Sequence, residues 1–284
     1  MGFTLNLTED GTITRPTLAP PPSDAHKYSR GHAMVWSGPP LRTGASRLAA
    51  QAALAVGAGL VTIIGDRAAL VEQAAHVTAI MLREADDALA CIDQRVTALA
   101  IGPGAGAGVA DSVCALLKRE IPMVLDADAI TAFAANPARL FELLGAHDVM
   151  TPHAGEFARL FPDIDLADRA AAAYSAARRS GAVVLLKGPH THIAAPDGRV
   201  AVNRHASPWL ATAGSGDVLT GLICGLMAQG VGAFDAACIA AWLHGDIGVR
   251  AGPGLTADKM MDHIPLVLRG CLHDESADDT GSRT

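Results

Sequence analysis

The strongest constraint on this chain is a regular alternation of short apolar runs with longer segments rich in alanine and leucine. The apolar runs fall at 31–38, 60–65, 76–82, 96–102, 122–128, 147–152 and 182–188. The helix-length segments fall at 44–59, 109–120, 127–144, 153–161 and 166–179. This order is typical of βαβ units, which form a parallel sheet with helices on both faces. We therefore predict an α/β fold with three αβα layers and a mostly parallel central sheet.

The segments after residue 188 differ from this pattern. Residues 191–203 form two strand-like runs around a Pro-Asp-Gly turn, which predicts a hairpin at the sheet edge. From residue 215 onward the chain is expected to be largely helical. Since no linker is visible between residues 30 and 270, we expect one domain covering residues 26–273.

The two ends of the chain have a different composition. Residues 1–25 contain the sequence PTLAPPPSD and are expected to be a Pro-rich arm that forms neither helix nor strand. Residues 274–284, DESADDTGSRT, are expected to be a disordered acidic tail.

Composition and charge exclude several classes of function. The 284 residues carry a net charge of -7 without a basic block, so we expect neither nucleic acid nor membrane as a partner. The apolar stretch 48–65 changes from alanine-rich to β-branched, which indicates a core helix followed by a core strand. The N-terminus lacks the pattern of a signal peptide. Five cysteines without a CxxC pair indicate reduced, mostly buried thiols in a cytoplasmic protein.

Loops that follow the strands of a parallel sheet are the expected ligand sites. AIGPGAGAG (100–108) is such a loop, and its glycines would let backbone N–H groups approach a phosphate or a ring. Pro103 and the missing Lys-Ser/Thr ending separate it from dinucleotide-binding and P-loop motifs. A flexible turn without a ligand is the alternative, and the loop alone does not decide between the two.

Two acidic residues end the run at 122–128. A carboxylate at this place could hold Mg²⁺ through water. Capping of the next helix is the favoured interpretation of Asp128, whereas the role of Asp126 stays open.

The sequence TPHAGEF places Thr151, His153 and Glu156 at a strand-to-helix turn. They could start the helix, with Glu156 in its first turn. A metal site at His153 and Glu156 would lack a third ligand. We favour contact of His153 with a polar substrate.

Lys187 stands at the end of an apolar strand, in LLKGPHT. An unpaired buried ammonium is costly, so the side chain must reach water or an anion. With Gly188 and Thr191 it could hold a nucleotide, and the alternative is a surface lysine that extends to solvent.

A further site is expected where Gly214, Ser215 and Gly216 precede a helix of about four turns. The first N–H groups of a helix have no intrahelical partner, and its dipole is positive there. We therefore predict an anion hole formed by these three residues. Asp217, in the first turn, either caps the helix or takes a proton from a hydroxyl that attacks phosphorus. The small residues around it leave room for a ligand, which favours the base.

Together these segments resemble the ADP-dependent (S)-NAD(P)H-hydrate dehydratase family of the ribokinase-like superfamily. The resemblance runs from about Lys27 to Pro265. Its specific part is TPHAGE followed by LKGPHT and GSGDVLTG, since GSGD alone is shared with many small-molecule kinases. It implies a ribokinase-like fold. It also implies dehydration of the S-epimer of hydrated NADH or NADPH, with ADP cleaved to AMP and phosphate.

The resemblance also implies roles for individual residues. Ala45, Gly104, His153 and Asp217 would contact the hydrated nicotinamide nucleotide, with Asp217 as the base. The expected nucleotide-binding residues are Lys187, Gly188, Pro189, His190, Thr191 and Gly216. Mg²⁺ is expected with the phosphates, and ADP is the expected co-substrate.

The sequence departs from the family pattern at two points. The family usually has Gly-Ser after the first strand, whereas Gly38 is followed here by Pro39 and Pro40, with loss of a hydroxyl and an N–H. HAGE also replaces the commoner His-Pro-Gly-Glu. Many relatives are fused to an epimerase domain, for which these 284 residues leave no room, so we expect a separate epimerase. The alanine-rich helices leave surface for a homo-oligomer.

Two other functions compete with the dehydratase. One is an ATP-dependent kinase of a small hydroxylated metabolite, which would use the same base and anion hole. The other is a nucleotide-sensing module without turnover. The order of TPHAGE and LKGPHT favours the dehydratase over the kinase, and an intact Asp217 argues against the sensing module.

Overall fold

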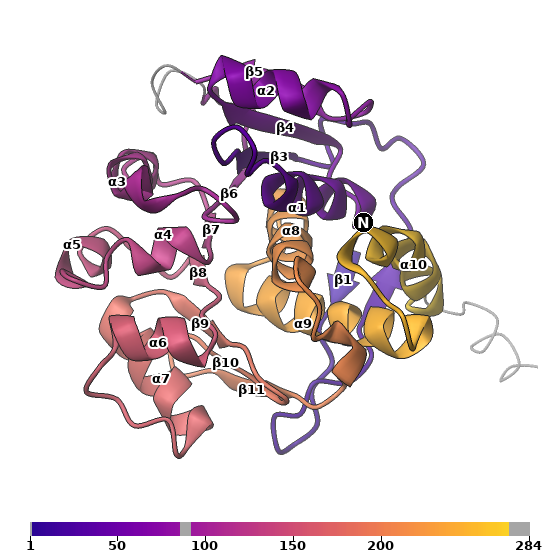
Figure 1. Ribbon diagram of the computed structural model, residues 1–284. Helices are drawn as coiled ribbons and strands as arrows, with labels where there is room; N and C mark the ends of the chain where they lie inside the picture. Colours follow the sequence, from indigo (N-terminus) through magenta and orange to yellow (C-terminus); the bar gives the residue numbers. More distant parts are fainter. Residues whose placement is uncertain (1, 86–91, 273–284) are drawn as a thin grey trace, which may run out of the picture.

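The computed structural model describes residues 2–85 and 92–272, and a nine-stranded sheet runs through it (Figure 1). Its strand order is β11-β10-β9-β8-β7-β6-β3-β4-β5. The strands are β3 (His32–Trp36), β4 (Leu60–Gly65), β5 (Met81–Glu84), β6 (Ala98–Ile101), β7 (Met123–Leu125), β8 (Val149–Met150), β9 (Val183–Leu186), β10 (Thr191–Ala194) and β11 (Val200–Asn203). All neighbours from β9 to β5 are parallel, and β10 is antiparallel to β9 and β11. The mostly parallel sheet and the edge hairpin are therefore confirmed.

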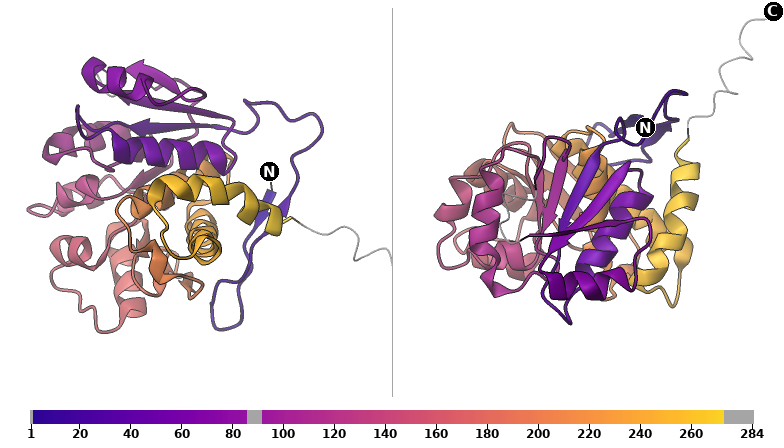
Figure 2. Two further views of the ribbon diagram at one scale, coloured as in Figure 1. Left: turned by 45° about the vertical axis from the view of Figure 1, so that its right-hand side comes forward. Right: turned by 90° about the horizontal axis from the view of Figure 1, so that it is seen from above.

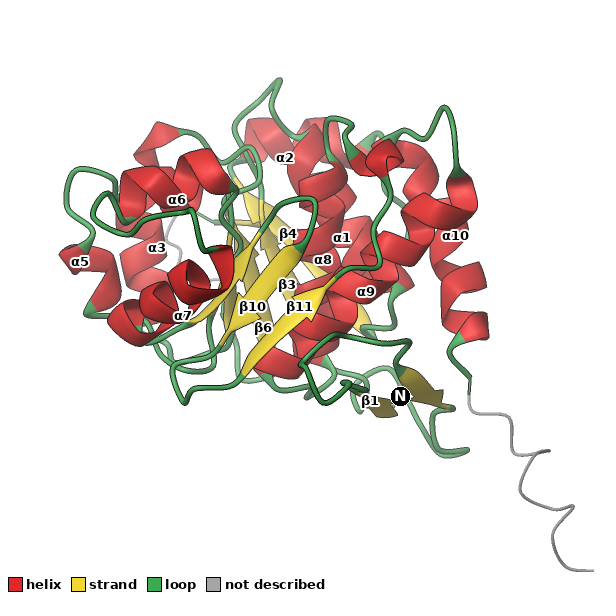
Figure 3. Ribbon diagram, turned by 90° about the horizontal axis from the view of Figure 1, so that it is seen from below, coloured by secondary structure: helices red, strands yellow, loops and turns green. Residues whose placement is uncertain are grey.

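Helices cover both faces of this sheet (Figures 1 and 3). One face carries α1 (Gly44–Ala55), α8 (Ser215–Ala228), α9 (Ala233–Ala251) and α10 (Ala257–Gly270). The other carries α3 (Ala110–Leu117), α4 (Asp128–Thr131), α5 (Ala138–Phe141), α6 (Ala154–Leu160) and α7 (Arg169–Ser180). Successive strand residues alternate between the two cores: Val35 faces the first and Met34 the second. The predicted three layers are confirmed.

The helices α1 and α8 approach each other closely because small residues line their contact. A Cβ atom added at Gly221 would collide with the carbonyl of Ala49, and one at Gly225 would lie 2.6 Å from the carbonyl oxygen of Ala53. The two glycines are one turn apart on the same face of α8. This packing fixes the N-terminus of α8 at the edge of the sheet where the parallel strands end.

Two predicted elements differ from the structure, and one helix was not predicted. The run at 76–82 contributes only its end to β5, whose pairing with β4 begins at Met81. The segment 127–144 forms two short helices, because Pro137 interrupts it and becomes the N-cap of α5. The unpredicted helix is α2 (Arg67–Ala74), which begins after Asp66, whose side chain accepts a hydrogen bond from the N–H of Ala69 at 2.9 Å.

The expectation that residues 1–25 form no strand was wrong. Strands β1 (Gly2–Thr4) and β2 (Thr17–Ala19) pair antiparallel beside the end of α10 (Figures 2 and 3). The prolines flank β2 and leave its N–H groups free to donate, so Leu18 bonds to the carbonyl of Cys271 at 2.6 Å. The expected acidic tail, 274–284, lies outside the described residues.

Two predictions from composition can be compared with the structure. Four cysteines, Cys114, Cys224, Cys238 and Cys271, are free and buried, as expected. Cys91 lies outside the described residues. Among residues 2–85 and 92–272, no helix combines the length and the apolar character needed to cross a membrane.

Candidate active site

The site lies near the switch point of the sheet, where successive strands change from one side of β3 to the other. The order of the strands places β4 and β5 on one side of β3, and β6 to β9 on the other. The loops after β3 and β6 meet at this switch point, and ligands of parallel α/β sheets usually bind at such a place, outside the carboxyl ends of the strands. The two loops are in contact: a Cβ atom at Gly38 would collide with the carbonyl of Gly104, and one at Gly104 would lie 3.3 Å from Ala45 Cβ. The structure thus brings Gly104 and Ala45 together.

The glycine-rich loop after β6 has a fixed shape. Gly102, Gly104 and Gly106 have φ angles of 125°, 65° and 87°, which L side chains rarely adopt. The carboxylate of Asp128 accepts a hydrogen bond from the N–H of Gly106 at 2.7 Å. No side chain caps α4, so the favoured interpretation of Asp128 as a helix cap was wrong. Asp128 instead connects the glycine-rich loop, through this hydrogen bond, to the segment that follows β7.

The N-terminus of α8 keeps free hydrogen-bond donors. Its N-cap is Gly214, with a left-handed φ of 88° and no side-chain cap. The N–H groups of Gly216 and Asp217 donate to no group in residues 2–85 and 92–272. Asp217 therefore does not cap the helix, and two adjacent donors are available for an anion.

Asp217 has the properties of a carboxylate that can take a proton near neutral pH. Burial, together with repulsion from Asp126, raises the pKa of Asp217 to about 6, against the opposing attraction of Lys187. Within the described part of the chain, its carboxylate makes no hydrogen bond. Above pH 6 the group is therefore ionised and unoccupied, as a general base must be.

Lys187 is an ion-paired residue rather than a surface lysine. Its Nζ lies 2.8 Å from Asp126 Oδ1 and 4.0 Å from Glu156 Oε2. Burial alone would lower the pKa of Lys187, but the neighbouring carboxylates outweigh burial and raise that pKa above its ordinary value. The alternative of a side chain extending to solvent was wrong. Asp126 itself is only 2% exposed, and its other oxygen accepts a hydrogen bond from Thr220 Oγ1 at 2.8 Å.

His153 starts helix α6. Its Nδ1 accepts hydrogen bonds from the N–H groups of Gly155 and Glu156 at 2.9 and 3.2 Å. In return, Glu156 Oε2 accepts from the N–H of His153 at 2.8 Å, which completes a capping box. The helix-start interpretation, which we did not favour, therefore holds, while half of the side chain remains exposed at a pocket. In the residues that the structure describes, no three His, Cys, Asp or Glu side chains form a group that could hold a metal.

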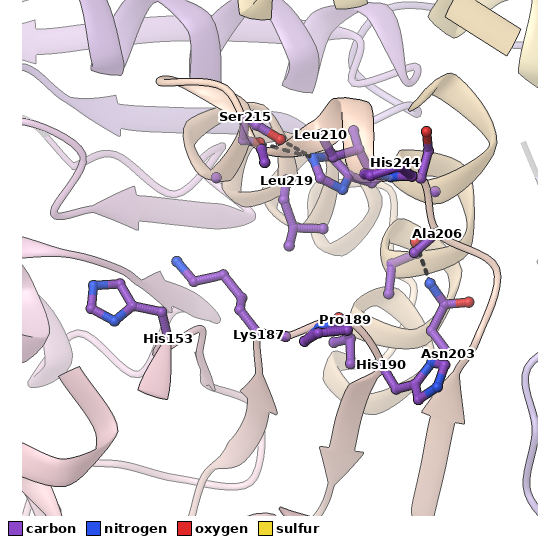
Figure 4. Close-up of a pocket in the computed structure, with 18 of the residues that line it drawn as sticks. His153, Lys187, Pro189, His190, Asn203, Ala206, Leu210, Ser215, Leu219 and His244 are labelled. Carbon is purple, nitrogen blue, oxygen red and sulfur yellow. Dashed lines mark hydrogen bonds between the residues drawn. The ribbon is translucent and has the colours of Figure 1, made fainter. Parts of the chain in front are cut away.

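A cavity of about 890 Å³ opens beside the N-terminus of α8 (Figure 4). All the predicted nucleotide-binding residues line it, and so does His153. Its wall further includes Asn203, Pro208, Leu210, Thr212, Ser215, Leu219, Ala241 and His244. In Figure 4, His153 and Lys187 lie at one end and Ser215 with His244 at another. Ala45, Gly104 and Asp217 do not line this cavity, so the predicted substrate contacts fall into two groups.

Two polar wall residues had no predicted role. His244 Nε2 lies 2.9 Å from Ser215 Oγ and 3.0 Å from the carbonyl oxygen of Ser215. Burial lowers the pKa of His244 to about 4, so the ring is neutral at physiological pH. Asn203 Nδ2 donates to the carbonyl of Ala241 at 2.8 Å. These residues come from α9 and the edge strand, and no sequence motif places them beside the loops that end the parallel strands.

The loop that carries Pro39 and Pro40 is braced by α2. Leu41 has a left-handed φ of 68°, and its N–H donates to the two carboxylate oxygens of Glu72 at 3.0 and 2.9 Å. The Leu41 side chain is 93% exposed. The departure from the family pattern therefore gives a loop of defined shape after the carboxyl end of β3.

Comparison with known proteins agrees with this geometry. Residues 33–265 match the family model described as NAD(P)H-hydrate dehydratase. The chain is 41% identical over 272 residues to the bifunctional NAD(P)H-hydrate repair enzyme of Moorella thermoacetica, covering 87% of this chain and 51% of that protein. It is 38% identical over 256 residues to the ADP-dependent (S)-NAD(P)H-hydrate dehydratase of Neisseria meningitidis serogroup B, covering 87% and 86%. The chain thus spans about half the length of the bifunctional relatives.

Solved structures give the same result for the fold. The ADP/ATP-dependent NAD(P)H-hydrate dehydratase of Bacillus subtilis, co-crystallised with ATP/Mg²⁺, is similar with a TM-score of 0.78 and 26% identity, covering 90% of this chain and 95% of that one. A ribokinase-like superfamily protein of Enterococcus faecalis has a TM-score of 0.77 at 23% identity, which confirms the ribokinase-like fold. Since the matching region includes every strand of the central sheet except the first residue of β3, this chain belongs to the NAD(P)H-hydrate dehydratase family.

Proposed function

We propose that this protein dehydrates the S-epimer of hydrated NADH and NADPH while ADP is cleaved to AMP and phosphate. The observation that carries the proposal is the unpaired, ionisable carboxylate of Asp217 beside the free N–H donors of α8. Membership of the family supports the reaction, and the Neisseria relative, named for ADP and for the S-epimer, supports the choice of co-substrate. The same comparisons favour a dehydratase over a kinase of a small metabolite.

The proposal places the two substrates on opposite sides of the N-terminus of α8. The nucleotide occupies the cavity of about 890 Å³, whose size suits a ligand of this kind. The hydrated nicotinamide lies near Ala45 and Gly104, where the loop of Gly104 meets α1 and the backbone of Arg42. Of the predicted anion hole of Gly214, Ser215 and Gly216, the N–H of Ser215 donates to the carbonyl of Thr212 at 3.3 Å, so the donors of α8 that stay free among the described residues are those of Gly216 and Asp217. Asp217 itself lies between the two sites.

The chemistry then follows from the leaving group. Hydroxide leaves a ring carbon poorly, whereas phosphate leaves well. Asp217 accepts the proton of the ring hydroxyl while the oxygen of that hydroxyl bonds to the β-phosphorus of ADP. The bond between this phosphorus and the oxygen of AMP breaks at the same time. The N–H groups of Gly216 and Asp217, with Lys187 below them, stabilise the charge on the transferred group. The lone pair of the ring nitrogen then expels phosphate, and loss of a ring proton restores the reduced nicotinamide.

Magnesium is part of the proposal, held mainly by the nucleotide phosphates. Mg²⁺ commonly keeps several waters and binds one or two carboxylates together with phosphates. Glu156 and Asp126 are the carboxylates near Lys187 that fit such an ion through water, because both oxygens of Asp126 already have partners. When bound, the ion would neutralise phosphate charge.

The partners and the location of the protein stay predictions. We propose that a separate epimerase converts the R-epimer, because the dehydration that we propose takes only the S-epimer. Self-association and a cytoplasmic location are further predictions, and light scattering of the purified protein would test the first.

The direct test of the function is an assay with heat-hydrated NADH. We expect ADP to restore the absorbance of reduced nicotinamide, with one phosphate released per molecule restored. A reaction without ADP serves as the control. Absence of recovery in the presence of ADP and Mg²⁺ would contradict the proposal. Accumulation of a stable phosphorylated product would instead indicate a kinase.

A further inference from the structure

Several carboxylates lie around one ammonium group beneath the N-terminus of α8. Asp126 comes from the end of β7, Glu156 from α6 and Asp217 from α8. Asp126 is the nearest to Lys187 Nζ, at 2.8 Å, while Glu156 lies at 4.0 Å. The charge of Asp217 acts on the same ammonium without a hydrogen bond. Asp126 is therefore the residue that fixes where this cation lies.

Asp126 acts on the cavity only through its partners. It is 2% exposed and does not line the cavity. Both carboxylate oxygens are used, since Oδ1 pairs with Lys187 and Oδ2 accepts from Thr220 Oγ1 at 2.8 Å. Thr220 belongs to the second turn of α8, so one carboxylate joins the cation to the helix whose N-terminus would hold the phosphate.

The position of the pair relative to α8 is given by Gly216. A Cβ atom at Gly216 would lie 3.5 Å from Lys187 Nζ and 3.9 Å from Asp126 Oδ2. The ammonium therefore lies directly under the free N–H groups of the first turn. A cation held there adds to the positive end of the helix dipole and strengthens the site for an anion.

We propose that Asp126 is a positioning residue for the nucleotide: it binds Lys187 with one oxygen and Thr220 with the other, and so holds the ammonium at the phosphate site beneath Gly216. This inference rests on the proposed function and assigns a role to a residue that the sequence left open. A second consequence concerns Asp217, whose carboxylate faces the charges of Asp126 and Lys187. In the part of the chain that the structure describes, Glu156 and the neutral His244 are further titratable groups around Lys187, and His153 Nε2 lies 3.4 Å from Glu156 Oε1.

A double-mutant cycle on ADP binding tests the inference. The four proteins are wild type, Asp126→Asn, Lys187→Met and the double variant, each titrated with ADP in a calorimeter. We expect Asp126→Asn to weaken binding about 10-fold when Lys187 is present and less than about 2-fold when it is Met, because contacting residues couple strongly. An equal effect in both backgrounds would overturn the inference, and so would unchanged or tighter binding in the single variant.

The matched control is Asp148→Asn. Asp148 is also buried, at 1% exposure, and accepts from the N–H groups of Met123 and Gly145 at 3.0 and 2.9 Å. It stands before β8, at the opposite end of the sheet from Asp126. Both variants should melt at a lower temperature, but only Asp126→Asn should change ADP affinity. A similar loss of affinity in Asp148→Asn would reduce the role of Asp126 to stability.

The pH profile gives a second readout that a purely structural role would not change. Because repulsion from Asp126 raises the pKa of Asp217, Asp126→Asn should move the acid limb of kcat/KM to lower pH. Asp148→Asn should leave the limb in place, and an unmoved limb in Asp126→Asn would contradict the inference.

The wild-type protein separates this inference from the proposed function. Wild-type protein that binds ADP without dehydrating the hydrate would contradict the proposed function alone. Wild type that does not bind ADP would overturn both.

Discussion

The two halves of the proposed site are built from different parts of the chain. The nucleotide half is a cavity with side-chain walls, among them Asn203, Leu210 and Leu219. The hydrate half is lined by backbone, where the loop of Gly104 meets the loop of Gly38. Side chains can match the shape of a base, whereas glycines let a flat ring approach the backbone. Specificity for the nucleotide should therefore be distributed over several side chains, and specificity for the hydrate should depend on the absence of a few Cβ atoms.

The two charged groups between these halves also differ. Lys187 is paired with a carboxylate at 2.8 Å, while Asp217 has no hydrogen-bond partner among the described residues. A paired cation keeps its position and its charge. A partly buried, unpaired carboxylate keeps a raised pKa and can accept a proton. This contrast assigns binding to Lys187 and proton transfer to Asp217.

The largest effect is expected from Asp217→Asn. Asparagine keeps the size of the side chain but cannot accept the proton, so turnover should fall by about 10²–10⁴-fold. ADP should still bind, because the donors of α8 are unchanged. Initial rates with hydrated NADH and calorimetry with ADP measure the two quantities. Near-normal turnover would remove the catalytic role of Asp217.

The next effect, on the nucleotide half, is expected from Lys187→Ala. Loss of a charged donor to phosphate should weaken ADP binding about 10- to 100-fold. The KM for the hydrate should change much less. Lys118→Ala, which alters an exposed lysine at the end of α3, is the matched control. ADP affinity equal to that of the control would show that Lys187 does not meet the nucleotide.

The hydrate half can be tested separately with Gly104→Ala. The new Cβ would lie 2.9 Å from the carbonyl oxygen of Arg42, at a φ of 65° that costs an L residue roughly 1–2 kcal/mol. If the substituted residue also displaces the substrate by a similar free energy, the KM for the hydrate should rise about 10-fold. ADP affinity should stay unchanged. Gly108→Ala is the control, because it has open space around it in the same region of the chain. Equal effects of the two substitutions would place Gly104 outside the substrate site.

A smaller effect is expected at His153, where two substitutions separate capping from ligand contact. His153→Ala should lower the free energy of unfolding by about 1 kcal/mol, since alanine cannot cap α6. His153→Asn should keep most of that stability because asparagine caps well. If His153 also contacts the hydrate, as the family resemblance implies, the KM should rise about 3-fold in both variants. A normal KM for the hydrate in His153→Asn would show that His153 only caps α6 and does not contact the hydrate.

The smallest effect concerns stability and pH. The pKa of Asp217 is about 6 in the folded protein, above its value of about 3.9 in an unfolded chain. The ionised group therefore opposes folding fully above about pH 6, and this penalty decreases as the pH falls from about 6 towards about 3.9. Asp217→Asn should accordingly raise Tm at pH 8, by about 2–4 °C for each 1 kcal/mol gained, and less at pH 5. Melting curves at both pH values measure this, and an equal difference at both would contradict the shift.

The sequence predicted those features that depend on neighbouring residues. Alternating apolar runs predicted the parallel sheet, and the position of Asp217 in a first helical turn predicted a carboxylate beside free N–H groups. Contacts between distant residues could not be read in this way. The pair of Asp126 and Lys187 joins positions 61 residues apart, and the Asp128 contact to Gly106 joins positions 22 apart. Such pairs form only when strand order brings two loops together.

The measurement that tests the central claim most directly follows the oxygen of the hydrate hydroxyl. Hydrated NADH prepared in ¹⁸O-water carries the label on the ring hydroxyl. If Asp217 deprotonates that hydroxyl and its oxygen attacks phosphorus, the label should appear in the released phosphate, at one atom per NADH restored. Mass spectrometry of the phosphate gives the answer. Label found in water, with unlabelled phosphate, would contradict phosphorylation of the hydroxyl and the assignment of Asp217 as its base.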